Sequence, residues 1–447
     1  MKSRVLLIAS ILFSSFLQAA DPEITVSQDH SDGVYARNEK VTWTFDVKGD
    51  RSGLTALPYK VKKDAAGIVL SGTIDLSSGP AVISASREEP GALLTEIYAM
   101  DSSKLLPIAM GGAVIAPDEI QPAKSAPDDF DIFWKAKLKE LDAVAANPIL
   151  EAVAVDNIKN AEGVECFKVT LDNIRSTHVR GILAKPAKAG KYPAMLMVNS
   201  AGVFGLDKAS VIAQAKPGWI VLNVSAHDLP VDEAEGFYKN LKETSLKNYY
   251  AIGNEDRETS YFLGMFLGCV RGAEYLASRA DWDGKTLIVT GTSQGGLQSL
   301  AVAGLFPKIS VAMVMVPAGC DNYAPLANPP RGVAWPYWMA KYAQQGKDFA
   351  KVQETAGYFD GINFASRIHC PALVAVALLD IAARPAGVIA AYNSMNTAKK
   401  LIIMPTSDHY GQNHGNGPRN LCPYFPEFFA WKEALQKEKA LPIIIKK

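Results

Sequence analysis

The chain has 447 residues, of which 48% are hydrophobic and 21% are charged. This composition is typical of a globular protein with a sizeable core and excludes a disordered or fibrous chain. Acidic and basic residues number 46 each, so the formal net charge is zero, and nothing indicates a field that would attract nucleic acid or an anionic membrane.

The segment 1–20 has the pattern of a secretory signal peptide. Lys2 and Arg4 precede a mostly apolar run at 5–17, and small residues follow up to Ala20. The apolar run is too short to span a bilayer, for which about 20 residues are needed. The alternative is a membrane-tethering anchor that is not cut. We predict a secreted or periplasmic protein with no membrane span in its later part.

Residues 21–115 are predicted to form a small immunoglobulin-like β-sandwich. Polar and apolar residues alternate over 40–47, which is the period of a half-buried strand, and turn residues such as those at 31–33 separate short runs. Trp43 lies on the inward side of this pattern, so core packing is favoured over stacking on a sugar. Three prolines in 116–127 then indicate a linker.

The part of the chain at 128–447 is predicted to be one α/β catalytic domain with a mostly parallel sheet. Pro127 and two aspartates favour a helix that begins near Phe130. Beyond about residue 150, short continuous apolar runs alternate with helical stretches, which suits strands buried on both faces of a sheet. The expected strands are 194–198, 219–224, 287–290, 311–316, 372–379 and 401–404, and the clearest helices are 261–278 and 296–303.

The segment 291–296, Gly-Thr-Ser-Gln-Gly-Gly, matches the pattern G-x-S-x-G, in which a nucleophilic serine occupies a sharp strand-to-helix turn. Glycines on either side of that serine allow close packing around a strained backbone. The pattern alone is weak, because Gly and Ser are common. Here an apolar strand precedes it and an apolar helix follows at 297–303. We therefore predict Ser293 as a nucleophile rather than as part of a packing turn.

A serine hydroxyl needs a base to take its proton, and in folds with this motif the acid and then the histidine follow the serine. His409 closely follows the last expected strand and is favoured over His414, while His369 precedes a strand and is interpreted as structural. Asp380 directly follows a buried strand and is favoured as the acid, with a helix or turn cap as the alternative. Asp408 is the weaker candidate, because adjacent side chains rarely point together.

The negative charge that forms on an attacked carbonyl requires backbone donors. One is expected to be the amide of Gln294, the residue after the nucleophile. The second is expected from the loop that follows the strand ending near Asn199, through the amide of Gly202 or Val203.

Several segments together resemble the acetyl xylan esterase / cephalosporin C deacetylase family of carbohydrate esterases. They are the helix start at 128–134, the nucleophile motif at 293–296, the approach to the acid strand at 358–371, and the positions 379–380 and 391–393. The likeness covers roughly residues 125–430 and leaves the predicted sandwich outside.

The resemblance implies an α/β-hydrolase fold, a triad of Ser293, Asp380 and His409, and the removal of acetyl groups from an acetylated oligo- or polysaccharide. It implies no metal and no organic cofactor. The chain departs from the family at 225–230, where the family often carries Arg-Gly-Gln. His227 in this segment is interpreted as structural or pocket-lining rather than catalytic.

The segment 321–357 is rich in Pro and aromatic residues and reads as an insertion over the site. Trp335, Tyr337 and Trp338 are candidates for stacking on sugar rings, and packing within a lid is an equal alternative.

Two other functions remain open from the sequence. A peptidase of the prolyl-oligopeptidase type shares the motif G-x-S-x-G-G, but the chain before residue 150 is too short for a β-propeller. A non-catalytic carbohydrate-binding protein would not need the complete order of Ser, Asp and His. Five widely spaced cysteines without a CxxC pair favour buried free thiols over a zinc site or a disulfide framework, although one disulfide is possible.

Overall fold

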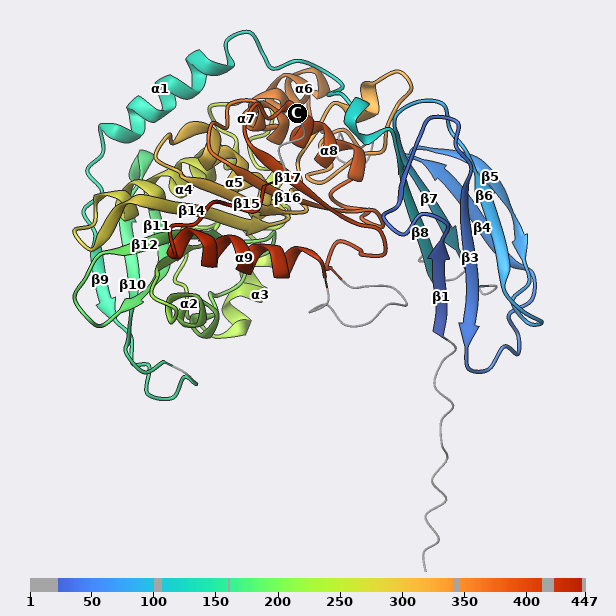
Figure 1. The fold of residues 1–447 in the computed structure, drawn as a ribbon. Coiled ribbons are helices and arrows are strands. Elements are labelled where there is room, and N and C mark those ends of the chain that lie inside the picture. Colours follow the sequence, from blue (N-terminus) through green and yellow to red (C-terminus); the bar gives the residue numbers. More distant parts are fainter. Residues whose placement is uncertain (1–22, 100–106, 160, 341–345, 412–421, 444–447) are drawn as a thin grey trace, which may run out of the picture.

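The computed structural model describes residues 23–99, 107–159, 161–340, 346–411 and 422–443, so the predicted signal peptide lies outside the described residues. The chain forms an all-β part at 23–115, here called the β-region, and an α/β part that follows it (Figure 1). No helix in the described ranges is long and apolar enough to cross a membrane. None of the five cysteines forms a disulfide within the described ranges, and four of them are buried.

The β-region consists of two sheets that share one core. The strand orders are β1-β3-β6 and β2-β8-β7-β4-β5. Trp43 is fully buried in the core between the sheets, in agreement with the packing interpretation. The strands are β1 (Glu23–Gln28), β2 (Val34–Tyr35), β3 (Val41–Lys48), β4 (Leu57–Lys63), β5 (Gly67–Ile74), β6 (Ala81–Ala85), β7 (Gly91–Ile97) and β8 (Ala109–Ile115).

The α/β part is built on one nine-stranded sheet with the order β17-β16-β15-β14-β12-β13-β11-β10-β9. The strands from β17 to β13 pair in parallel, and β11, β10 and β9 extend the sheet with antiparallel pairs. The strands are β9 (Ile149–Ala152), β10 (Val164–Asp172), β11 (His178–Pro186), β12 (Tyr192–Val198), β13 (Ile220–Val224), β14 (Trp282–Thr292), β15 (Val311–Met315), β16 (Ala372–Ala377) and β17 (Lys399–Met404).

Helices cover both faces of this sheet. Figure 1 shows α2 and α9 on one face and α4, α5, α7 and α8 on the other. The continuous apolar runs of the parallel strands follow from this arrangement, because their side chains are buried on both faces. The helices are α1 (Phe130–Asp142), α2 (Lys208–Ala215), α3 (Glu235–Glu243), α4 (Tyr261–Ser278), α5 (Gln294–Leu305), α6 (Phe349–Ala356), α7 (Gly361–Ala365), α8 (Pro385–Ser394) and α9 (Tyr424–Gln436).

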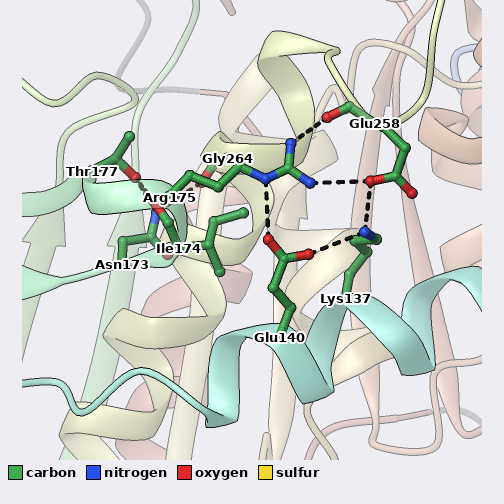
Figure 2. Close-up of polar contacts among 8 residues, drawn as sticks. All are labelled: Lys137, Glu140, Asn173, Ile174, Arg175, Thr177, Glu258 and Gly264. Carbon is green, nitrogen blue, oxygen red and sulfur yellow. Dashed lines mark hydrogen bonds and ion pairs between the residues drawn. The ribbon is translucent and has the colours of Figure 1, made fainter.

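The helix α1 is tied to the turn before β11 and to the loop before α4 by a network of charges (Figure 2). Arg175 Nε donates to Glu140 Oε1 at 3.0 Å, and Arg175 Nη2 donates to Glu258 Oε2 at 3.0 Å. Lys137 Nζ donates to both carboxylates, at 3.0 Å to Glu140 and 2.6 Å to Glu258. These pairs link α1 to both segments at the surface, while its buried aromatic residues pack in the core.

Candidate active site

Ser293 lies at the turn between β14 and α5, as the sequence motif predicts. Its backbone has φ 61° and ψ −121°, a strained conformation for a residue with a side chain. A Cβ on Gly291 would lie 2.5 Å from the backbone of Gly295, and a Cβ on Gly295 would lie 2.5 Å from Val198 O. Only glycine therefore fits these two positions. The tight turn places Ser293 at the carboxyl end of β14.

The predicted acid and base meet Ser293 at the carboxyl ends of the parallel strands. His409 Nε2 lies 2.8 Å from Ser293 Oγ, and His409 Nδ1 lies 2.7 Å from Asp380 Oδ2. A carboxylate only accepts hydrogen bonds, so the Nδ1–H of His409 donates to Asp380, and Nε2 is the acceptor for the Ser293 hydroxyl. The three side chains form one continuous chain of hydrogen bonds.

The carboxylate of Asp380 is completely buried. Its Oδ1 atom accepts hydrogen bonds from the amides of Ala382 and Ala383, both at 2.8 Å. Both oxygens of Asp380 therefore have partners, which fixes the orientation of the carboxylate toward His409.

The pKa of His409 is raised above its ordinary value. Burial by itself disfavours the charged imidazolium, but the hydrogen bond to Asp380 and the negative charge of that carboxylate outweigh burial. Asp408 adds a smaller contribution of the same sign. This electrostatic environment suits a base that takes up a proton during a reaction.

The alternative candidates for the acid and the base are Asp408, His369 and His414. Asp408 Oδ1 accepts the amide of Tyr410 at 2.9 Å and caps its own turn. His369 precedes β16 at the opposite end of that strand from Asp380. His414 lies outside the described residues.

The first predicted oxyanion donor, Gln294, is the first residue of α5, so its amide is one of the free donors at a helix N-terminus. The second predicted segment, Gly202 and Val203, follows β12. In this structure the amide of Gly202 donates to Tyr249 Oη at 3.2 Å. Val203 is buried in a small cluster with Tyr238 and Tyr249.

Both polar groups of Gly202 have partners that the sequence did not indicate. Tyr249 Oη accepts the amide of Gly202 and donates to the side-chain oxygen of Gln294. His227 Nε2 lies 2.8 Å from Gly202 O, and His227 Nδ1 lies 2.7 Å from Tyr261 Oη. We call Tyr249, His227 and Tyr261 the Gly202 clamp.

The tautomer of His227 follows from these partners. A carbonyl oxygen only accepts, so Nε2 of His227 carries the proton and Nδ1 accepts from Tyr261. Burial lowers the pKa of His227, and the hydrogen bond to the Gly202 carbonyl, which acts in the opposite direction, has a smaller effect. The ring therefore stays neutral. Burial also raises the pKa of Tyr249 to about 12, which keeps its hydroxyl protonated. The predicted structural role of His227 agrees with these contacts.

The aromatic side chains of the insertion pack largely against the protein. Trp338 is 2% exposed, stacks on Phe262 with ring centroids 5.2 Å apart, and donates from Nε1 to Tyr250 O at 2.7 Å. Trp335 is also buried and lies 5.6 Å from Phe262 between ring centroids. The ring of Trp338 is therefore part of the core in this structure, which favours the alternative of packing over stacking on a sugar for this residue. Tyr337 is half-buried.

Residues 117–417 match a family model described as acetyl xylan esterase (AXE1). Acetyl esterase Axe7A of Xylanibacter ruminicola is 28% identical over 413 residues, which are 91% of each chain. The acetyl xylan esterase from Paenibacillus sp. R4 superposes with a TM-score of 0.58 at 21% identity, over 72% of this chain and 98% of that one. Acetyl xylan esterase 1 from Thermoanaerobacterium sp. JW/SL YS485 gives a TM-score of 0.56 at 22% identity, over 66% and 92%. These superpositions confirm the predicted α/β-hydrolase fold.

Proposed function

Since this chain belongs to the acetyl xylan esterase family and is a carboxylic ester hydrolase, we propose that it removes acetyl groups from carbohydrates through an acyl-enzyme formed on Ser293. The observation that carries the proposal is the chain of hydrogen bonds from Asp380 through His409 to Ser293, with distances of 2.7 and 2.8 Å. The proposed substrate is an acetylated oligo- or polysaccharide.

In the first half of the reaction, Ser293 Oγ attacks the acetyl carbonyl carbon while His409 Nε2 takes the hydroxyl proton. Asp380 stabilises the resulting imidazolium, which fits the raised pKa of His409. The tetrahedral intermediate then expels the sugar oxygen, and His409 returns its proton to that oxygen. The products of this half are the free sugar hydroxyl and an acetyl ester on Ser293.

In the second half, His409 takes a proton from a water molecule, and the water oxygen attacks the acetyl ester. Collapse of the second tetrahedral intermediate releases acetate and restores the Ser293 hydroxyl. We propose that the amides of Gln294 and Val203 donate to the negatively charged oxygen in both halves, because the Gly202 amide already donates to Tyr249. The position of Gln294 at the start of α5 supports this role, because helix N-termini favour negative charge.

A fluorophosphonate probe together with a substrate panel tests the proposal. We expect the wild type to be labelled and to release acetate from acetylated xylan, and Ser293→Ala to lose labelling and about 10⁴–10⁶-fold in kcat. Failure to label the wild type, or equal labelling of Ser293→Ala, would contradict the proposed nucleophile. Cleavage of peptide amides without release of acetate from any acetylated sugar would contradict the proposed substrate class.

We further propose that residues 1–20 direct export of the protein, on the basis of their basic start and short apolar run. Expression of the full chain followed by N-terminal sequencing tests this. We expect the mature protein outside the cytoplasm to start near residue 21. Retention of residue 1 in a membrane fraction would instead support the uncleaved anchor.

A further inference from the structure

The strand β7 is buried along its whole length and on both of its faces. Packing of the two sheets of the β-region against each other accounts for the burial of only one face. In a two-sheet sandwich one face of each strand packs inward and the other faces solvent. Leu93 and Ile97 belong to the core of the β-region, but the alternate residues Ala92 and Leu94 are also buried. The edge strand β5 shows the contrast, because all but its last residue are exposed. A second layer therefore covers the outer face of β7.

The strand β8 has the same two-sided burial. Ala113 and Ile115 lie in the core of the β-region, whereas Val114 packs in the core of the α/β part. Figure 1 shows β7 and β8 turned toward β16, β17 and α8. The outer face of the sheet thus lies against the strand ends that precede Asp380 and His409.

The β-region approaches the α/β part closely at Leu378, two residues before Asp380. A Cβ on Gly112 of β8 would lie 2.7 Å from the backbone oxygen of Leu378. A Cβ on Gly33, in the turn before β2, would lie 2.7 Å from Leu378 Cδ1 and 3.2 Å from Pro405 Cβ. Pro405 follows β17, the strand that leads to His409.

The β-region contacts two segments, one at Leu378 and one at Pro405, and backbone hydrogen bonds join these two segments to each other. The amide of Leu378 donates to Met404 O at 3.1 Å, and the amide of Leu379 donates to Ser407 O at 3.1 Å. A displacement of Leu378 would therefore move both the acid and the loop that carries the base.

A second connection reaches the acid loop through the insertion. Asp64, which follows β4, is fixed by Arg87 at 2.8 Å and accepts the amide of Gly332 at 2.8 Å through its backbone oxygen. The neighbouring Val333 O accepts Arg384 Nε at 3.2 Å. The buried guanidinium of Arg384 interacts electrostatically with Asp380 and with Glu96 of β7.

The segment predicted as a linker is also fixed in place. Asn393 Nδ2 on α8 donates to Pro117 O at 2.8 Å and to Ile120 O at 2.9 Å. The amide of Ala123 donates to Asp321 Oδ1 at 2.9 Å. The β-region is therefore held against the α/β part in two ways: by the connecting segment 116–127 and by the outer face of β7 and β8.

We propose that the β-region is a positioning element of the active site, which holds the Asp380 and His409 loops together through the contact of β8 and the 31–33 turn with Leu378 and Pro405. The inference rests on the proposed function in assigning Asp380 and His409 as acid and base. The β-region lies outside the matched family segment, which begins at residue 117.

Two neighbouring glycines of β8 provide a matched test. A Cβ on Gly111 would lie 2.5 Å from Trp43 Cδ1 inside the β-region, while a Cβ on Gly112 meets Leu378. Gly111→Ala therefore strains the β-region alone, and Gly112→Ala strains its contact with the acid strand. Both substitutions add one methyl group at adjacent positions of the same strand.

We expect Gly112→Ala to lower kcat on a small acetate ester about 10- to 100-fold with little change in KM, because a small misplacement of catalytic groups reduces rate strongly. The acidic limb of its kcat/KM profile moves to lower pH, because a weaker contact with Asp380 lowers the pKa of His409. Gly111→Ala loses thermal stability but keeps kcat per titrated active site and the wild-type pH profile. Equal effects of the two variants on kcat, with the acidic limb unmoved, would overturn the proposal.

If Gly112→Ala does not fold, Val114→Ala and Ile115→Val form a milder pair. Val114 faces the α/β core and Ile115 faces the β-region core, and both changes remove methyl groups without a clash. Only Val114→Ala is expected to shift the pH profile. An unshifted profile in Val114→Ala would count against the proposal.

Nuclear magnetic resonance separates this inference from the proposed function. The Nδ1 proton of His409 reports its hydrogen bond to Asp380 in any folded variant, whether or not the protein cleaves an ester. A signal that is perturbed in Gly112→Ala and Val114→Ala, but not in Gly111→Ala and Ile115→Val, supports positioning by the β-region. Identical signals in all of them reject it, even if the wild type is an active esterase.

Discussion

The charge on His409 is controlled by one buried carboxylate. A base must be neutral to accept a proton, so kcat/KM is expected to fall as the pH drops through the pKa of His409. Asp380 raises this pKa above its ordinary value of 6.5. The acidic limb of the wild-type profile is therefore expected above pH 6.5, and a limb well below that pH would contradict the assignment.

Replacement of Asp380 by Asn tests the same interaction. Without the carboxylate, burial remains and lowers the pKa of His409, so the acidic limb is expected to move below its wild-type position. The amide can also hold His409 in the wrong tautomer, and kcat is expected to fall about 10⁴-fold. Steady-state kinetics over a pH series measures both effects. Circular dichroism compares the fold of the variant with that of the wild type, so that loss of folding is not mistaken for loss of rate.

The Gly202 clamp is expected to act on the loop that stabilises the oxyanion. Tyr249→Phe removes the hydroxyl that joins Gly202 to Gln294 and leaves the ring in place. We expect kcat to fall about 10-fold with a small change in KM, because a donor is loosened and not removed. Tyr250→Phe, at the neighbouring position, serves as a control. Wild-type kcat in Tyr249→Phe would show that the clamp does not position the loop.

Local signals in the sequence identify the residues that the site brings together. Ser293 is marked by its glycines, and Asp380 and His409 are marked by their places directly after apolar strands. The Gly202 clamp could not be found in this way, because Tyr249 lies in a loop without a motif and meets Gly202 only in the folded chain. The sequence left the role of Trp338 open between stacking and packing, since an aromatic ring has the same composition signal whether it faces a sugar or the core.

At the scale of elements, alanine substitutions at two helical glycines are expected to have opposite effects on stability. A Cβ on Gly264, the fourth residue of α4, would meet no atom within 4 Å other than its chain neighbours and the backbone of its own helix. Gly264→Ala is therefore expected to stabilise the protein by about 1 kcal/mol, the usual difference between the two residues inside a helix. Gly295→Ala in α5 is expected to destabilise it, because its Cβ would lie 2.5 Å from Val198 O. Chemical denaturation measures both, and destabilisation by Gly264→Ala would contradict the packing described for α4.

The parallel strands and the long helices were predictable because burial imposes a regular pattern on them. The expected helix 261–278 matches α4, and the apolar runs fall on the strands β12 to β17, although β14 begins at Trp282, five residues before the run expected at 287–290. The antiparallel strand β9 had no such pattern, since all four of its residues are exposed. Its place in the sheet follows from its pairing with β10.

At the scale of the whole molecule, the two parts are expected to unfold together. The outer face of β7 and β8 is buried against the α/β part, and loss of either part exposes that face. We expect a single calorimetric transition for the wild type, because a buried interface couples the stabilities of both sides. Two separate transitions, the first of which leaves esterase activity intact, would show that the β-region is an independent module.

The order of synthesis gives this interface a further consequence. The ribosome completes β8, which ends at Ile115, about 260 residues before it reaches Leu378. At about 5–20 residues per second the delay is on the order of 15–50 s. During that time a newly made sandwich displays an apolar surface with nothing to cover it. Chaperones that hold nascent chains are therefore expected to bind this early segment, and the last third of the polypeptide releases them by covering the same surface.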